Sequence, residues 1–500
     1  MQDVIRIHQD DNVAVALRPL SEGETIAVGS LQVLVKEDIP QGHKFALKPI
    51  GRDEQVVKYG FRIGYAKEDI GAGCWVHVHN VKTALGDVLE YSYHPVNSGL
   101  GKTAPAAFDG YRRADGRVGV RNEIWIIPTV GCVNSIAQSL ERQAKSLAAG
   151  NVEDVIAFVH PYGCSQMGGD QENTRRILAD LINHPNAGGV LVLGLGCETN
   201  QIGGLMEQEG LRENGLLHTF NIQETGGTRK TVEHGIALVQ AMLAQADRAR
   251  RQPVPASRLT VGLQCGGSDG YSGISANPAL GAAVDLLVRH GGTAILSETP
   301  EIYGGEHLLT RRAATPEVAA KLLARLRWWE DYCARNDAEM DNNPSAGNKA
   351  GGLTTILEKS LGAIAKSGTT RLADVYEYAE TVRERGLVFM DTPGYDPVSA
   401  TGQVAGGANL ICFTTGRGSA YGCAPAPSLK LSTNTALWQR QSDDIDINCG
   451  EVVDGAQSVA EMGERIFRLM LETASGRRTR SEEHGYGQNE FVPWQLGAVM

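Results

Sequence analysis

The sequence is poor in cysteine and has no long apolar run, and each shortage excludes a class of protein. Nine cysteines in 500 residues, an odd number without framework spacing, argue against a disulfide-built secreted protein and favour free thiols or metal ligands. No window approaches the roughly 20 apolar residues of a membrane span, and residues 1–12 lack a basic segment followed by an apolar stretch. We therefore expect a soluble, cytoplasmic protein with no membrane partner.

Clusters of basic residues are also missing. The chain has 47 Lys and Arg against 58 Asp and Glu, a formal net charge of -11, and no basic run resembles a phosphate-binding footprint. Nucleic acid is thus excluded as an expected partner. The length of 500 residues exceeds what one hydrophobic core usually supports, so several domains are expected.

The hydrophobic pattern predicts an α/β protein with a small all-β module at its N-terminus. Residues 1–95 carry short alternating runs such as VAVAL and LQVLV between turns, whereas residues 96–108 are rich in Pro, Gly, Ser and Ala and predict a linker. Residues 109–250 and 251–500 alternate apolar runs with helical patterns, which is typical of Rossmann-like, mostly parallel sheets. The clearest helical patterns lie at 173–184, 231–249, 279–290, 316–333 and 458–472.

Four apolar runs break into a turn that contains glycine and cysteine. IWIIPTVGCVN, VIAFVHPYGCSQ, VLVLGLGCETN and LTVGLQCGGSDG place Cys132, Cys164, Cys197 and Cys265 at corresponding points. Because open α/β sheets bind ligands at the carboxyl ends of their strands, these junctions predict one shared site. The thiols are candidates for an iron–sulfur cluster or for supporting a metal, although no two are separated by only two residues. Packing in the core is the alternative.

Histidines in the N-terminal module have metal-ligand spacing. In WVHVHN, His77 and His79 are two residues apart on an expected strand, so both side chains would leave the same face and reach one ion. His8 and His43 are further candidates. The alternative is that one histidine of the pair is an ordinary packed or exposed strand residue.

Three loops are suited to an anionic ligand. NPSAGNKAGGLTT places amide, hydroxyl and ammonium donors before a helix that contains Glu358 and Lys359, and FTTGRGSAYG places an arginine between two glycines after a strand. The CGGSDG turn permits close approach of the backbone to an anion. Solvated capping loops are the alternative. The candidates for substrate binding are Lys44, Ser268, Asp269, Asn348, Thr354, Thr355 and Arg417.

Several longer motifs together resemble the altronate/galactarate dehydratase family. They are HKFAL, VHVHN, YRRADGRVGVRNEIWIIPTVGCVN, YGCSQ, HPNAGGVLVLGLGCE, CGGSDGYSGISANPALG, NPSAGNKAGGLTTILEKSLG and FTTGRGSAYG. The likeness runs from about residue 5 to the C-terminal EFVPWQLGAVM. It implies an N-terminal β-clip module of the SAF type, two α/β regions, and dehydration of a small sugar acid with a divalent metal, iron(II) or manganese(II).

The reaction that the resemblance implies removes water from a 2,3-dihydroxy carboxylate. The C2 proton and the C3 hydroxyl leave, and the enol becomes a 2-keto-3-deoxy acid. A divalent ion that chelates the carboxylate and the C2 hydroxyl would stabilise the enediolate. The catalytic candidates are His43, His77, His79 and Lys349, and the metal-ligand candidates are His8, His77 and His79, with the two duties unresolved between them.

The VHVHN motif favours D-altronate, giving 2-keto-3-deoxy-D-gluconate, because galactarate-specific members tend to have acidic residues there. Galactarate, another 2,3-dihydroxy acid and elimination of sulfite from sulfolactate are alternatives. So are a dehydratase that depends on a cluster at the four cysteines and a sugar-acid-binding protein without activity. A homodimer is expected, since most soluble oligomers are symmetric dimers.

Overall fold

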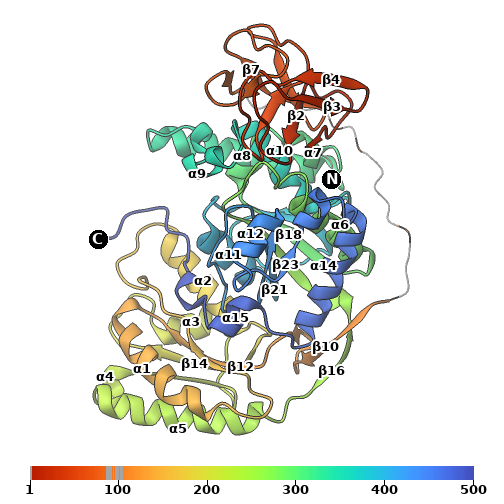
Figure 1. Ribbon diagram of the computed structural model, residues 1–500. Coiled ribbons are helices and arrows are strands. Elements are labelled where there is room, and N and C mark those ends of the chain that lie inside the picture. Colours follow the sequence, from red (N-terminus) through yellow and green to blue (C-terminus); the bar gives the residue numbers. More distant parts are fainter. Residues whose placement is uncertain (1–2, 86–92, 94, 96–100, 102–104) are drawn as a thin grey trace.

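The computed structural model describes residues 3–500 except 86–92, 94, 96–100 and 102–104, so most of the expected linker at 96–108 lies outside the described residues. The expected α/β architecture with an N-terminal all-β module is confirmed. The N-terminal module and the middle region lie at opposite ends of the C-terminal region (Figure 1), although they are consecutive in the sequence. Within the described residues, no helix is both long and apolar enough to cross a membrane.

The N-terminal module consists of three small antiparallel sheets, in the orders β1-β2-β5-β8, β3-β4 and β6-β7-β9. Alternating burial along β3 fits strands with one face in a core and the other in solvent. The strands are β1 Val4–Ile5, β2 Val13–Ala16, β3 Thr25–Val28, β4 Leu31–Leu34, β5 Lys44–Ala46, β6 Gln55–Lys58, β7 Phe61–Ala66, β8 Trp75–Val76 and β9 Val81–Lys82.

The middle region is built on a four-stranded parallel sheet in the order β13-β12-β14-β15. A second sheet, β11-β10-β16, pairs the strand that enters this region with the strand that leaves it. The elements are β10 Ala107–Arg112, β11 Val118–Gly119, β12 Glu123–Pro128, α1 Asn134–Ala144, β13 Val155–Ala157, α2 Asp170–Ile182, β14 Ala187–Gly194, α3 Ile202–Gln208, β15 Leu217–Asn221, α4 Ile222–Thr225, α5 Thr228–Ala246 and β16 Arg251–Pro255.

The C-terminal region is built on a seven-stranded parallel sheet in the order β19-β20-β18-β17-β21-β22-β23. Its central strands are buried along their length, except for the partly exposed Thr260 at the start of β17, because helices cover both faces. The strands are β17 Thr260–Cys265, β18 Thr293–Leu296, β19 Leu372–Tyr376, β20 Gly386–Met390, β21 Leu410–Thr415, β22 Ser428–Ser432 and β23 Ile447–Asn448.

Helices of the C-terminal region connect these strands, and two short 3-10 helices, η4 Thr299–Glu301 and η6 Ala365–Ser367, lie near the centre of the sheet edge. Thr355 caps α10 by accepting from the Glu358 backbone N–H. The α-helices are α6 Ala276–Arg289, α7 His307–Thr310, α8 Pro316–Arg335, α9 Ala346–Ala350, α10 Ile356–Ile364, α11 Asp396–Ala405, α12 Thr435–Arg440, α13 Gly450–Val453, α14 Val459–Ala474 and α15 Arg480–His484.

Candidate active site at the carboxyl edge of the large sheet

A cavity of about 660 Å³ lies at the carboxyl ends of the central strands of the seven-stranded sheet. Strand β18 lies on one side of β17 and β21 lies on the other, so the order of the strands reverses at β17. Open α/β sheets bind ligands at such a switch point. Trp329 and Tyr332 of α8 form an apolar wall. The polar side chains that line the cavity include Cys265, Glu301, Asn348, Lys359, Asp396 and Arg417.

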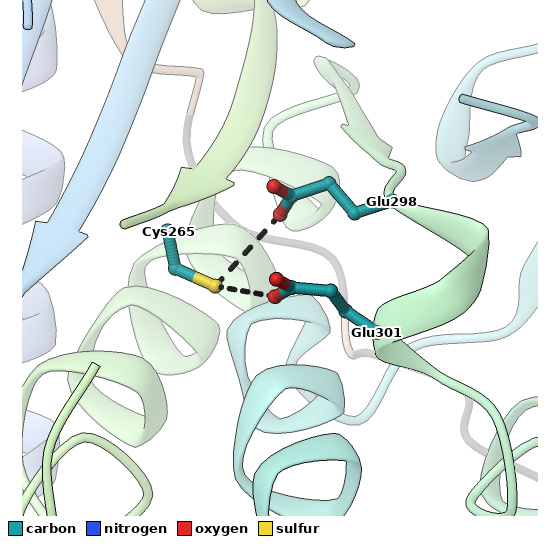
Figure 2. A group of neighbouring side chains, drawn as sticks. All are labelled: Cys265, Glu298 and Glu301. Atoms are coloured by element: carbon teal, nitrogen blue, oxygen red, sulfur yellow. Dashed lines mark hydrogen bonds between the residues drawn. The ribbon is translucent and has the colours of Figure 1, made fainter. Parts of the chain in front are cut away.

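Cys265, Glu298 and Glu301 lie close together (Figure 2), and two of them, Cys265 and Glu301, line this cavity. Cys265 is the last residue of β17, and its Sγ lies 3.7 Å from Glu298 Oε2 and 3.2 Å from Glu301 Oε2. The two glutamates follow β18, and Glu298 has a φ of 70°, a left-handed conformation that turns the chain into η4. All three side chains are buried, so two carboxyl groups and a thiol share a region from which water is largely excluded.

Two lysines supply the opposing charge. Lys366 Nζ donates to Cys265 Sγ at 2.8 Å and lies 3.1 Å from Glu298 Oε2. Lys359 Nζ, on α10, donates to Glu301 Oε1 at 2.6 Å. A buried carboxylate that lost its ammonium partner would keep its full desolvation cost, so each lysine offsets part of the cost of burying its carboxyl group.

The protonation states of the three acidic side chains differ. Burial raises the pKa of Glu298 to about 8, despite the ammonium of Lys366. Burial also acts on Glu301, but Lys359 and Lys366 outweigh it and hold the pKa of Glu301 below its usual value. At the cavity wall, burial and the charge of Glu301 raise the pKa of Asp396 to about 7. Asp396 can therefore take up or release a proton near neutral pH.

The same cluster fits a divalent ion. Cys265, Glu298 and Glu301 each offer a ligand atom, and these atoms lie within 4.8 Å of one another. Glu298 Oε1 is buried without a hydrogen-bond partner, which leaves one carboxylate oxygen free to bind a cation. A thiolate with two carboxylates is a donor set of intermediate softness, suited to a transition ion such as iron(II). Lys366 holds the position beside the thiol and would have to move as such an ion binds.

Two of the residues predicted to bind substrate line the cavity, namely Asn348 and Arg417. Ser268 and Asp269 lie in the loops around it, where they make hydrogen bonds. Asp269 accepts hydrogen bonds from Thr433 and Asn434, and the Ser268 carbonyl accepts one from the Asn348 side chain.

The remaining predicted binding residues lie on the side of α10 that contacts the N-terminal module. Thr355 donates to the Ile63 carbonyl at 2.6 Å, and Thr354 donates to Glu358 Oε2 at 2.7 Å. The Lys44 ammonium is fully buried and donates to the Gly352 carbonyl at 2.7 Å and to Glu358 at 3.0 Å. In this arrangement Lys44 joins two parts of the protein and does not face the cavity.

The prediction that His77 and His79 share one face of a strand is wrong. Strand β8 ends at Val76, and the Asn80 side chain accepts from the His77 backbone N–H to form a turn. His77 is buried and stacks on Trp75, whereas His79 is exposed. The two-residue spacing therefore does not aim both rings at one point.

His43 and His77 lie side by side, with ring centroids 4.9 Å apart, and form a histidine cluster with Trp75, whereas His8 lies elsewhere in the module. His43 accepts from the Trp75 indole N–H at 3.2 Å, and its other ring nitrogen faces the Ala350 carbonyl at 3.4 Å. His8 is half-exposed and accepts from the Asp10 backbone N–H. Among the described residues, no set of three ligand atoms within 4.8 Å of one another includes a histidine.

The histidine cluster and the cavity are separated by the backbone at 350–352. His43 contacts this segment on one side, and a Cβ at Gly351 would approach the Arg417 side chain to 3.3 Å on the other. Lys349 is half-buried on α9 next to Asn348 and is not among the described residues that line the cavity. The catalytic roles of His43, His77, His79 and Lys349 remain predictions.

The expectation of one site shared by four cysteines is also wrong. Cys265 ends a strand of the seven-stranded sheet, whereas Cys132, Cys164 and Cys197 follow strands of the four-stranded sheet. The junctions look alike in sequence because both sheets are parallel and turn at the same edge.

Four residues of the site were not predicted: Glu298, Glu301, Lys366 and Asp396. For the two glutamates a signal exists, since SETPE follows the apolar run TAIL directly. Asp396 likewise follows the apolar run of β20 after a short turn. Lys366 carries no local signal, because it enters the site only through the packing of η6 against α6 and β18.

Comparison with known proteins matches the chain along its length. Residues 2–84 match the altronate/galactarate dehydratase SAF domain, residues 110–247 the second domain of D-galactarate dehydratase/altronate hydrolase, and residues 256–499 the C-terminal domain of D-galactarate/altronate dehydratase. The altronate dehydratase of Bacillus subtilis is 40% identical over 100% of both chains. That of Escherichia coli is 40% identical over 99% of both.

The galactarate dehydratase (L-threo-forming) of Escherichia coli is 36% identical over 96% of this chain and 94% of its own. Matches of this identity over nearly the full length, together with the three matched domains, show that the chain belongs to the altronate/galactarate dehydratase family.

Proposed function

We propose that the protein is a sugar-acid dehydratase that acts on D-altronate in the cavity at the edge of the seven-stranded sheet. The observation that carries the proposal is the meeting of a carboxylate-binding arginine, Arg417, with the Glu301–Lys359 pair and Asp396 around one cavity. The choice of altronate is supported by two relatives named altronate dehydratase at 40% identity.

Substrate binding follows from the cavity wall. Its volume of about 660 Å³ lies within the range of small-molecule sites, and a six-carbon acid fits such a volume. The Arg417 guanidinium holds the substrate carboxylate through two parallel N–H donors. Asn348, held by its bond to the Ser268 carbonyl, orients the hydroxyl groups.

The proton steps fall to Asp396 and Lys359. Asp396, with its pKa raised to about 7, removes the C2 proton, and Lys359 donates a proton to the C3 hydroxyl as it leaves as water. The enol that remains becomes the 2-keto-3-deoxy acid. Cys265, Glu298 and Glu301 would hold an iron(II) or manganese(II) ion, which supplies positive charge that stabilises the enediolate.

The test is formation of 2-keto-3-deoxy acid from D-altronate, galactarate and sulfolactate in parallel, without oxygen, with iron(II), manganese(II) or chelator. We expect turnover of altronate that depends on added metal and is lost in an Asp396→Asn variant. Turnover of another acid instead would overturn the substrate, and full activity in chelator would overturn the metal. Full activity of Asp396→Asn beside an inactive His77→Ala would move the base to the histidine cluster.

A further inference from the structure

Three exposed cysteines lie together at the carboxyl edge of the four-stranded sheet, outside the site described above. Cys132, Cys164 and Cys197 follow β12, β13 and β14, which are neighbours in the order β13-β12-β14. Pro128 pairs with Leu193, and Cys132 and Cys197 each follow that pair by four residues. Since neighbouring strands are about 4.8 Å apart, the three loops start side by side.

Hydrogen bonds tie the three loops into one unit. The Gly131 N–H donates to the Tyr162 carbonyl at 2.9 Å and joins the first loop to the second. The Asn200 N–H donates to the Gly163 carbonyl at 3.0 Å and joins the second loop to the third. The Asn200 side chain also donates to the Thr129 carbonyl at 3.2 Å, which closes the set between the third loop and the first.

A glycine precedes each cysteine, and each lies close to a neighbouring loop or side chain, with the backbone contact at Gly163 leaving no room for a Cβ. A Cβ at Gly163, whose φ is 102°, would lie 2.1 Å from the Thr129 carbonyl oxygen. A Cβ at Gly131 would lie 3.1 Å from the His160 carbonyl oxygen, and one at Gly196, with φ 121°, would lie 2.6 Å from the Gln223 side chain. The loops are thus packed so that their cysteines project from a common base.

Hydroxyl donors lie beside one of the thiols. The Thr199 hydroxyl, on the third loop, donates to Cys164 Sγ at 3.7 Å, and the Ser165 hydroxyl lies 4.0 Å from the same sulfur. Cys132 lies in the turn that leads into α1, an 11-residue helix, whose N-terminal amides supply positive potential. Donors of this kind also stabilise the sulfur atoms of a bound metal cluster.

The spacing of the thiols separates the possible ligands. Around one tetrahedral ion, with metal–sulfur bonds of about 2.3 Å, the sulfur atoms lie about 3.8 Å apart. Among the described residues, the set of three ligand atoms within 4.8 Å of one another is that of Cys265, Glu298 and Glu301, and the exposed thiols are not such a set. All three are also free of disulfide bonds. Wider spacing suits a cluster with several metal atoms, in which each thiolate binds a different iron.

We propose that Cys132, Cys164 and Cys197 bind a 4Fe–4S cluster at this edge of the middle region. Each thiol loses its proton and binds one iron, so three irons have protein ligands. The fourth iron would have no ligand from Cys265, which is buried in the other sheet. Such an iron is open to oxygen ligands from small molecules such as hydroxy acids.

The experiment is reconstitution of the full-length protein with iron(III), a thiol reductant and sulfide without oxygen, followed by removal of unbound iron. We expect a brown protein with about four acid-labile sulfide per chain, about four iron besides any ion held by Cys265, Glu298 and Glu301, and bleaching of the colour in air. Cys132→Ser, Cys164→Ser and Cys197→Ser should each lose most of the iron and sulfide. Cys74→Ser, which changes a half-buried thiol of the N-terminal module, should keep both.

The outcomes are distinct. One metal ion per chain without sulfide would overturn the cluster: an ion lost in Cys164→Ser would indicate a single-ion site at this edge, and an ion kept in that variant would belong to Cys265, Glu298 and Glu301. No retained metal would overturn the site altogether. Circular dichroism and thermal unfolding of each serine variant separate loss of ligand from loss of fold. The readout is metal and sulfide, so it stands apart from the dehydratase test. A colourless protein that dehydrates altronate would overturn this proposal and leave the proposed function intact.

Discussion

Adjacent residues of α10 enter two different buried charge clusters. Glu358 faces the N-terminal module and accepts from Lys44 Nζ at 3.0 Å and from Lys58 Nζ at 2.7 Å. Lys359 faces the cavity and pairs with Glu301 at 2.6 Å. Both clusters remove charge from water at a cost of several kcal/mol per ion, so burial alone does not distinguish structure from chemistry.

The two clusters differ in whether every carboxylate oxygen has a hydrogen-bond partner. Both carboxylate oxygens of Glu358 have an ammonium partner, and the side chains of Lys44, Lys58 and Glu358 are at most 1% exposed. In the second cluster Glu298 Oε1 has no partner, and Glu301 lines a cavity. A closed cluster fixes one arrangement of two domains. An open one keeps a free oxygen and a titratable group beside space for a ligand.

The largest expected effect comes from the open cluster. Glu301→Gln removes the charge that holds the Lys359 ammonium and one of the three metal donors, so we expect kcat/KM on D-altronate to fall by about 10³-fold or more. Steady-state formation of keto acid measures it. The variant should also lose stability, because Lys359 keeps a buried charge without its partner, so circular dichroism has to show that the assayed protein is folded.

The matched control is Glu384→Gln, an exposed glutamate, which should keep full activity. If Glu301→Gln kept its activity within about threefold, the cluster would have no role in the reaction. The two faces of α10 would then not differ in function.

The closed cluster predicts a loss of stability. Glu358→Gln leaves Lys44 and Lys58 buried without a counter-charge, and breaking a buried ion cluster in this way typically costs about 3–5 kcal/mol. Urea unfolding followed by circular dichroism measures the change. A companion variant, Lys44→Met/Lys58→Met/Glu358→Leu, should recover much of the loss, since replacing the whole set removes the unpaired charges. Equal stability of Glu358→Gln and wild type would show that the cluster is not a structural joint.

A smaller effect is expected at the rim of the open cluster. Arg417→Lys keeps the charge but loses the planar pair of N–H donors, so KM for D-altronate should rise about 10- to 100-fold with less change in kcat. Arg383→Lys, at an exposed arginine away from the cavity, is the control. A fall in kcat with unchanged KM would place Arg417 in the chemical step and not in substrate binding.

The strand-and-turn pattern predicted the parallel sheets, because buried parallel strands are continuous apolar runs that end in glycine turns. Of the predicted substrate-binding residues, Asn348 and Arg417 line the cavity; Arg417 follows β21 and its turn, whereas Asn348 lies on α9. It could not assign Cys132 and Cys265 to different sheets, because strand order depends on contacts between residues far apart in the sequence.

Ion pairs between residues far apart in the chain could not be predicted from the sequence either. Lys44 looked like an anion-binding residue in sequence, and only the docking of the N-terminal module on α10 shows its bond to Glu358, 314 residues away. The turn at His77 was missed because alternation of apolar residues does not reveal that the Asn80 side chain ends the strand.

The smallest expected effect is a difference in the sign of pH dependence between the clusters. Burial acts on Glu358, but Lys44 and Lys58 hold its pKa well below the usual 4.5, so its stabilisation is present above pH 4.5 and is lost as the pH falls. Glu298 has its pKa raised from 4.5 to about 8, so its contribution is present below pH 4.5 and is lost as the pH rises towards 8.

In chelator, wild type should therefore lose unfolding free energy relative to Glu298→Gln as the pH rises, by at most about 1.4 kcal/mol per pH unit. For Glu358→Gln the difference should shrink as the pH falls below 4.5. Urea unfolding across the pH range measures both differences. If the stability of wild type relative to each variant changed with pH in the same direction, the opposite pKa shifts of Glu298 and Glu358 would be wrong. Added iron(II) should flatten the Glu298 dependence, because an ion on its free oxygen keeps the carboxylate ionised.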